Sequence, residues 1–232
     1  MTIEPIAFFK SPFASKFGIP RQSGLVPELR GEIRFTGEYR RAEAVRGLEG
    51  FGFIWLIWGF SANRRDPEAG WQPTVRPPRL GGNVRMGVFA TRSPFRPNPL
   101  GLSSVRVERI DFEGPDAPVI HVLGADLMDG TPIYDIKPYI PYADSHPDAS
   151  GGFTDGVGRE PLEVHVPEDL RAELERILGP EGVQALCGVL AQDPRPSYQD
   201  DPSRIYGMPF CGLDIRFKAE AGSLTVTGFE TE

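Results

Sequence analysis

The sequence predicts a mainly β fold, either a barrel or a sandwich, followed by a small α+β appendage. Up to about residue 142, the apolar segments are short, rich in β-branched and aromatic residues, and separated by Gly, Pro and Asp, a pattern typical of strands and tight turns. No G-x-G-x-x-G motif follows a strand pattern, and the alternation of strands and helices that defines a Rossmann fold is missing. Beyond residue 160 the spacing becomes helical, which sets the appendage apart.

Seven strands and one helix are expected in the first part of the chain. The expected strands cover residues 3–9, 31–36, 51–60, 86–90, 102–110, 118–124 and 132–137. Short strands with little helix indicate a barrel or a sandwich, and the helical pattern in this part is RRAEAVRGL at 40–48. The segment FGFIWLIWGF at 51–60 is apolar on both faces, which favours a central strand or an oligomer contact, with Trp55 and Trp58 in the core.

The second part follows a polar, Gly-rich segment at 143–158 that has no period and is interpreted as a linker or long loop. Two helices are expected at 167–178 and 181–192, because a proline opens the first and acidic residues occur in both first turns. Segments 210–218 and 223–229 alternate like a closing hairpin. We therefore expect three parts, which are a β-barrel or sandwich domain at 1–145, a linker at 146–159 and a small α+β domain at 160–232.

Composition and motifs exclude several classes of protein. The chain has 40% hydrophobic and 25% charged residues, which is ordinary for a globular protein, and no apolar run approaches the roughly 18 residues of a membrane span. The N-terminus lacks the basic start and apolar stretch of a secretory signal, and two cysteines are too few for a disulfide framework, so we expect a cytoplasmic protein. The histidines are scattered and no G-x-S-x-G elbow is present, so we expect neither a metal site nor covalent catalysis.

Positive charge is concentrated in one segment of an acidic chain. Between Arg64 and Arg106 there are eight arginines and two acids, a local balance of +6, which leaves −13 for the rest because the net charge is −7. Arginine rather than lysine suits planar, bidentate contacts with phosphate or carboxylate. A solvated charged face is the alternative interpretation, but the Pro and Gly residues between the arginines favour a rigid loop that holds a ligand.

Two motifs dominate the sequence, MGVFATRSPFRPNPLGLSS at 86–104 and DLMDGTPIYDIKPYIPYAD at 126–144. Together with KFGIPRQSG at 16–24, VRPPRLGGN at 75–83 and AQDPRPSY at 191–198, they closely resemble the TsaA-like, or TrmO, family in the order of that family. The resemblance covers almost the whole chain. It implies an S-adenosyl-L-methionine (SAM)-dependent methyltransferase, built on a single-sheeted antiparallel β-barrel with a C-terminal appendage. It also implies a homodimer that acts on N6 of threonylcarbamoyladenosine, next to the anticodon of threonine tRNA.

The resemblance further implies where SAM and RNA bind. Carried over by motif, the SAM-binding residues are Gln22, Ser23, Gly24, Ser61, Ala62, Arg92, Leu102, Asp126, Leu127, Met128 and Asp129. Because SAM presents carboxylate, ammonium and adenine groups, Arg92 suits an anionic group and Asp126 or Asp129 suits the ammonium or ribose. Asp129, which precedes a glycine, also fits a plain turn. Ser61-Ala62 departs from the His-Gln of the family, which keeps backbone groups but removes side-chain donors. The arginines expected to face phosphate are Arg76, Arg79, Arg85 and Arg96.

The late motif AQDPRPSY offers groups for catalysis. The N6 nitrogen is conjugated with the purine and the urea carbonyl, so its proton must leave around the time of methyl transfer. We hypothesise that Asp193 accepts this proton and that Arg195 clamps a carboxylate or phosphate. Tyr198 would stack on the flipped base, with Tyr206 nearby in sequence. The alternative is that 193–206 is a rigid connector.

Two other functions fit the same sequence. A SAM-binding regulatory or sensor protein would bind SAM without turnover, and a methyltransferase for another RNA or a small metabolite would not depend on threonylcarbamoylation. The late motif and the full appendage favour the tRNA enzyme. The tRNA isoacceptors, the identity of the proton acceptor and the way a dimer shares the site stay open.

Overall fold

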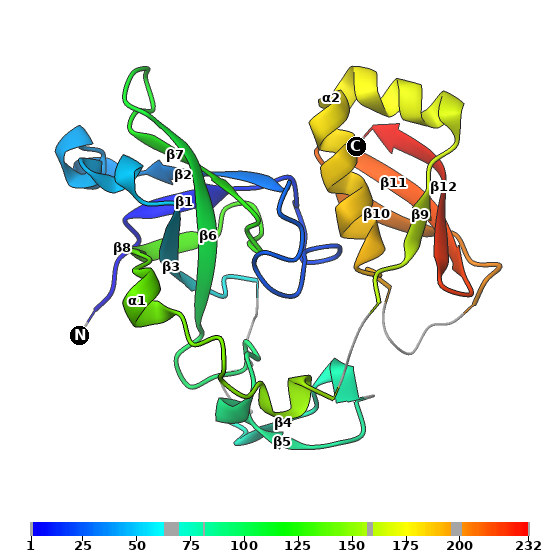
Figure 1. The fold of residues 1–232 in the computed structure, drawn as a ribbon, viewed down its shortest axis with the longest axis horizontal. Coiled ribbons are helices and arrows are strands. Elements are labelled where there is room, and N and C mark those ends of the chain that lie inside the picture. Colours follow the sequence, from blue (N-terminus) through cyan, green and yellow to red (C-terminus); the bar gives the residue numbers. More distant parts are fainter. Residues whose placement is uncertain (1, 63–69, 81, 157–159, 196–200, 232) are drawn as a thin grey trace.

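The computed structural model describes residues 2–62, 70–80, 82–156, 160–195 and 201–231, and it consists of a barrel with a smaller helix-and-sheet unit beside it (Figure 1). Six antiparallel strands close the barrel in the order β1-β2-β7-β6-β3-β8. Their bounds are Ala7–Lys10 (β1), Arg30–Phe35 (β2), Phe53–Gly59 (β3), Leu100–Asp111 (β6), Val119–Leu123 (β7) and Pro132–Pro138 (β8). The prediction of an antiparallel β-barrel is confirmed. In the described parts of the chain, no helix has the length and apolar character needed to cross a membrane.

Strand β3 is the central strand that the sequence predicts, hydrogen-bonded to β6 on one side and to β8 on the other. Ile54, Leu56 and Trp58 are buried in the barrel, whereas Phe53 is 45% exposed on the outer face, as the two-residue period of a strand requires. Trp58 pairs with Gly101 of β6, where a Cβ atom would approach the indole ring to 2.3 Å. Glycine at this position therefore leaves the room that the indole fills.

Two predicted elements of the first part are wrong in type. Residues 40–48 form no α-helix but the 3₁₀ turn Ala42–Val45 (η2) and the start of a second turn, Leu48–Gly50 (η3), and they follow a third turn, Gly37–Tyr39 (η1). Gly47 adopts a left-handed φ of 87° between the last two turns, which interrupts a helix. Val45 is the sole buried residue within the three turns, and it packs with the partly buried Leu48 against the barrel core.

The segment 86–90 is likewise not a barrel strand. Only Met86–Gly87 (β5) is extended, and it pairs with Thr74–Val75 (β4) in a hairpin outside the barrel. Val88–Ala90 forms a 3₁₀ turn (η5), and the Val88 carbonyl accepts hydrogen bonds from the backbone and hydroxyl of Thr91 and from Arg96. These local donors replace a strand partner, which is why the barrel has six strands rather than seven.

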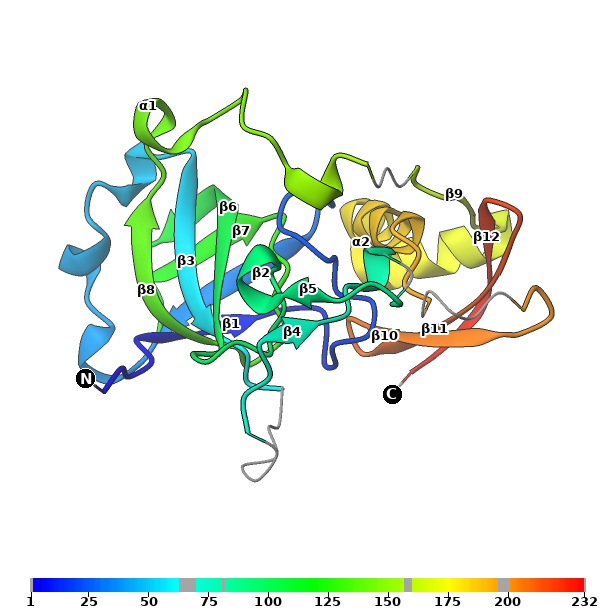
Figure 2. The same cartoon turned by 90° about the horizontal axis from the view of Figure 1, so that it is seen from below.

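The C-terminal unit is one helix segment packed on a four-stranded sheet (Figure 2). The sheet runs β10-β11-β12-β9, with bounds Tyr206–Phe210 (β10), Leu213–Glu220 (β11), Ser223–Thr231 (β12) and Glu163–His165 (β9). Helix α2, Glu168–Ala191, breaks at Gly179 before Pro180, so it contains the two expected helices. The expected hairpin is β11–β12. The segment predicted as a linker contains the end of a short helix, Pro141–Asp144 (α1), and a 3₁₀ turn, Gly152–Thr154 (η6).

The loop between β1 and β2 joins the two units. Phe13, Val26 and Leu29 from this loop belong to the core of the C-terminal unit, together with α2 and the four-stranded sheet. The backbone N–H of Cys211 also donates to the carbonyl of Pro12 at 2.9 Å. Because both of its ends are fixed in this way, the loop carries its middle part, residues 16–22, to one end of the barrel.

Candidate functional site

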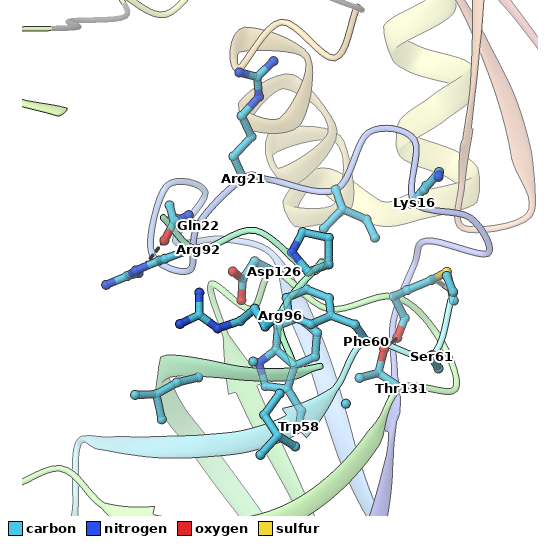
Figure 3. Close-up of a pocket in the computed structure, with 18 of the residues that line it drawn as sticks. Lys16, Arg21, Gln22, Trp58, Phe60, Ser61, Arg92, Arg96, Asp126 and Thr131 are labelled. Atoms are coloured by element: carbon cyan, nitrogen blue, oxygen red, sulfur yellow. Dashed lines mark hydrogen bonds between the residues drawn. The ribbon is translucent and has the colours of Figure 1, made fainter. Parts of the chain in front are cut away.

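A cavity of about 580 Å³ lies where β3 ends and β6 begins. Four segments surround it (Figure 3). They are the β1–β2 loop, the end of β3 with the residues after it, residues 91–99 before β6, here called the Arg/Pro loop, and the turn after β7. All four carry motifs or positions that the sequence analysis selected. The structure therefore brings together, from segments far apart in the chain, the groups that the motifs predicted to share a site.

Asp126 is the acidic residue in the wall of this cavity, alone among the described lining residues. Its carboxylate oxygen Oδ1 accepts a hydrogen bond from the Ser103 hydroxyl at 2.6 Å, and that hydroxyl accepts one from the indole N–H of Trp58 at 3.0 Å. Burial raises the pKa of Asp126, opposed by the Ser103 hydrogen bond, the nearby Arg92 charge and the Ser23 N–H. The two hydrogen bonds, from Trp58 to Ser103 and from Ser103 to Asp126, thus fix the orientation of this carboxylate from inside the barrel.

Two arginines of the Arg/Pro loop differ in what they can bind. Arg92 is exposed and donates a hydrogen bond to the side-chain oxygen of Gln22, which joins two of the motifs beside Asp126 (Figure 3). Arg96, which the sequence assigned to phosphate, donates instead to the carbonyls of Val88 and Thr91, at 3.2 and 2.7 Å. Arg96 therefore fixes the shape of the loop.

Most of the predicted SAM-binding residues line the cavity. The lining residues among them are Gln22, Ser61, Ala62, Arg92, Leu102, Asp126 and Met128. Ser23 contacts the cavity wall through the hydrogen bond of its N–H with Asp126.

Three of the predicted SAM-binding residues lie behind the lining. The Gly24 N–H donates to the Gly124 carbonyl at 2.8 Å, and Leu127 is 1% exposed in the barrel core. The Asp129 carboxylate accepts from the Ser11 N–H and pairs with Lys10, at 2.9 and 3.1 Å. Asp129 thus ties its turn to the β1–β2 loop, which matches the turn interpretation.

Of the residues predicted for catalysis, the three that the structure describes, Asp193, Arg195 and Tyr206, do not line this cavity. The carboxylate of Asp193 binds the guanidinium of Arg195 through both oxygens, at 2.9 and 3.2 Å. Tyr206 is 5% exposed in the C-terminal core and stacks on Phe217 with ring centroids 5.5 Å apart, which is the position of a core residue. Tyr198 lies outside the described residues.

A second cavity of about 1530 Å³ adjoins the first and shares part of its wall. The shared residues are Arg21, Gln22, Thr91, Arg92 and Pro94. Arg76 and Arg85, both assigned to phosphate by the sequence, line this second cavity and are exposed. Arg79 belongs to the 3₁₀ turn Pro78–Leu80 (η4), and its side chain is outside the described part of the structure.

Several residues of the first cavity are not predicted from the sequence. Trp58 is predicted as a core residue alone, and no site role is predicted for Ser103, Phe60 or Lys16. In the structure Trp58, Phe60 and Lys16 line the cavity, and Ser103 binds its carboxylate. Ser103 and Lys16 lie within quoted motifs, but nothing in the sequence showed which way their side chains point. No group of three or more His, Cys, Asp or Glu residues suited to a metal ion occurs in the described ranges.

The fold and this cavity define a class of protein: a closed β-barrel with a cavity of small-molecule size at its rim and one partly buried carboxylate in the cavity wall, outside the Rossmann class of nucleotide binders. Residues 8–145 match the model of the tRNA-methyltransferase O N-terminal domain, and residues 159–232 match that of the TrmO C-terminal domain. The chain belongs to the TrmO family.

Known proteins resemble the chain over about three quarters of its length or more. The tRNA (adenine(37)-N6)-methyltransferase of Escherichia coli K12 is 40% identical over 231 residues, which are 98% of this chain and 94% of the relative. A protein of the same name from Eikenella corrodens is 49% identical over 172 residues, which are 74% of this chain and 93% of the relative. The crystal structure of TrmO from Pseudomonas aeruginosa superposes with a TM-score of 0.79 at 31% identity, covering 99% of this chain and 98% of that one.

Proposed function

We propose that this chain transfers a methyl group from SAM to N6 of threonylcarbamoylated adenosine, next to the anticodon of threonine tRNA. The observation that carries the proposal is that three of the five family motifs, at 16–24, 86–104 and 126–144, line one cavity, with Asp126 as the single acidic residue among its described lining residues. Membership of the TrmO family and the names of the two bacterial relatives support the reaction and the RNA substrate. A tRNA substrate implies a cytoplasmic location.

The cavity fits SAM by size and by chemistry. About 580 Å³ lies within the roughly 300–1,000 Å³ of small-molecule sites. We assign the ammonium of SAM to the carboxylate of Asp126 and the carboxylate of SAM to the guanidinium of Arg92, because these two side chains carry opposite charges in the same cavity wall. Gln22, which is hydrogen-bonded to Arg92, lies beside them. The rings of Trp58 and Phe60, 4.4 Å apart, supply apolar surface for the rest of the donor. When bound, SAM supplies a methyl group on a positively charged sulfur.

The other residues of the site shape the cavity, and proton removal is assigned to a residue outside its lining. Ser61 and Ala62 offer backbone groups where β3 ends, and Asp129 and Gly24 hold the loops that shape the cavity. In-line attack requires the N6 nitrogen about 3–3.5 Å from the methyl carbon, so positioning supplies a large part of the acceleration. Our hypothesis for proton removal stays with Asp193, which must exchange its Arg195 partner for the substrate in order to accept a proton.

A direct assay separates this proposal from the two alternatives. The purified chain is incubated with SAM and with tRNA from a strain that lacks the methylation, once with and once without threonylcarbamoylation, and nucleosides are analysed by mass spectrometry. We expect an added methyl group on the threonylcarbamoylated nucleoside alone. SAM binding without any turnover would favour a sensor, and equal methylation of both tRNAs, or of a small metabolite, would favour a methyltransferase of different specificity.

We also propose that the chain works as a homodimer. The outer face of β3 supports this proposal, because Phe53 is 45% exposed and its ring lies 6.1 Å from that of Tyr139. Exposed aromatic clusters of this kind mark protein contacts. Light scattering on the purified chain should give twice the mass of one chain, and Phe53→Asp should reduce it; a monomeric wild type at micromolar concentration would contradict the proposal.

A further inference from the structure

The second cavity carries large aromatic side chains that no core explains. Trp71, Phe89 and Phe95 line it and are 44%, 69% and 53% exposed. None of the three belongs to the two hydrophobic cores formed by the described residues. Exposed rings gathered in one cavity indicate a binding surface, since single exposed apolar residues are normally scattered.

Two of these rings already form a platform. The centroids of Trp71 and Phe89 are 6.0 Å apart with an interplanar angle of 34°. The guanidinium of Arg96 lies 5.7 Å from the centroid of Phe89, and the hydrogen bonds of Arg96 with Val88 and Thr91 fix the turn that carries this ring. The ring is therefore placed before any ligand arrives, which lowers the entropy lost on binding.

The charge around the platform selects an anionic occupant. Arg76 and Arg85 line the cavity and are exposed, and none of its described lining residues is acidic, although the chain as a whole carries −7. Stacking rings combined with arginines are how proteins bind unpaired nucleotides, because the rings take the bases and the arginines take the phosphates.

The position of the platform indicates which nucleotides of the RNA would stack on it. Its cavity shares Gln22, Arg92 and three other residues with the proposed methyl-donor cavity. When the N6 nitrogen of an adenosine reaches the first cavity, the neighbouring nucleotides of the RNA therefore lie beside the second cavity. In an anticodon loop these neighbours are unpaired, so their bases are free to stack.

We propose that Trp71 and Phe89 stack on a nucleotide adjacent to the methylated adenosine and so hold the RNA loop open at the active site. This inference rests on the proposed function, because it takes the RNA substrate as given. It adds a role for aromatic residues to the electrostatic role of the arginines. Arg76 and Arg85 bind phosphate without regard to the bases, whereas the platform requires a base at one position.

Substitution of the exposed rings tests the proposal. Trp71→Ala and Phe89→Ala should each weaken binding of a threonylcarbamoylated anticodon stem-loop about tenfold, from the usual contribution of one stacked base. SAM affinity by calorimetry and the melting temperature should not change, because both rings are exposed. Phe89→Tyr, which keeps a ring, should restore wild-type affinity. Phe112→Ala is the matched control, since Phe112 is 44% exposed and does not line either cavity.

An RNA with an abasic site makes the test specific. Stem-loops in which one neighbour of the target adenosine lacks its base should bind the wild type about tenfold more weakly, and Phe89→Ala should lose little further affinity. If Phe89→Ala and Trp71→Ala bind intact RNA as tightly as the wild type, or if abasic sites weaken variants and wild type equally, the platform has no stacking role. A wild type that neither binds nor methylates the stem-loop would instead overturn the proposed function, and the inference with it.

Discussion

Replacing Asp126 by asparagine should weaken SAM binding without making the ligand-free chain less stable. The asparagine has nearly the same shape and can still accept the hydrogen bond that Ser103 donates at 2.6 Å. Because Ser103 and the Ser23 N–H already bind this carboxylate, we count one further charge-assisted contact with the ammonium of SAM. Losing the charge of one such contact costs about 1.5 kcal/mol, or roughly tenfold in Kd.

Stability should change in the opposite direction because burial penalises the charged form. The pKa of Asp126 is raised in the folded chain, mainly by burial, so the folded state binds a proton more readily than the unfolded state does. Above the raised pKa, the charged Asp126 lowers the free energy of unfolding of the ligand-free chain. This free energy then increases as the pH falls from the pKa of the folded state to the lower pKa of the unfolded state. Asparagine removes this penalty at neutral pH, so the melting temperature should stay equal or rise.

Calorimetry with SAM and thermal unfolding without it measure the two effects separately. SAM affinity of the wild type should also fall as the pH drops through the raised pKa, at a higher pH than an exposed aspartate would titrate, and Asp126→Asn should remove this dependence. Asp129→Asn is the control, since Asp129 binds Lys10 and Ser11 outside the cavity lining. Unchanged affinity in Asp126→Asn, or an equal loss in both variants, would refute the assignment of the ammonium to Asp126.

Three other predictions concern the Ser103 hydrogen bonds, Asp193 and the arginines of the second cavity. Ser103→Ala should lower the melting temperature by roughly 2–10 °C, because it leaves the buried Trp58 N–H without an acceptor at a cost of about 1–3 kcal/mol; an unchanged melting curve would contradict the hydrogen-bond chain. Asp193→Ala should lower kcat of methyl transfer far more than SAM affinity, and equal losses would remove its role as the proton acceptor. The affinity for tRNA should fall steeply with salt, and Arg76→Ala should reduce the slope of log K against log salt by about 1; an affinity independent of salt would argue against phosphate contacts.

The strand pattern of the barrel could be predicted because it depends on local sequence. Residues 53–58 are apolar without exception, which predicts the strand, and the structure buries Ile54, Leu56 and Trp58 but leaves Trp55, also predicted in the core, partly exposed between them. The 86–90 segment has the same apolar content, but Thr91 and Arg96 supply its hydrogen bonds locally. Such contacts depend on where a loop turns back, which residue types alone do not determine.

The site was predicted as a set of motifs rather than as a geometry. Asp126 and Asp129 belong to one motif and look equivalent in sequence, yet one lies in the cavity wall and the other binds Lys10. The difference comes from the chain beyond the motif, where Ser103 of β6 reaches Asp126 and the β1–β2 loop reaches Asp129. Tyr206 shows the same limit, because its position near a motif in sequence did not reveal that it packs in the C-terminal core.

The barrel differs from a Rossmann sheet in how it can bind the charged groups of a ligand, because its described residues form no glycine loop that leads into a helix N-terminus at the cavity. In that fold, backbone N–H groups and a helix dipole hold the ligand's anionic groups. In the site proposed for this chain, the charged groups of SAM are assigned to the side chains of Asp126 and Arg92, and neighbouring residues hold both of these side chains in place. Ser103 and Trp58 direct Asp126 from inside the barrel, and Arg96 holds the loop that carries Arg92. Trp58 fits only because Gly101 has no Cβ, so a single added methyl group at Gly101 should displace Trp58 and, through the Trp58–Ser103 and Ser103–Asp126 hydrogen bonds, disturb the carboxylate.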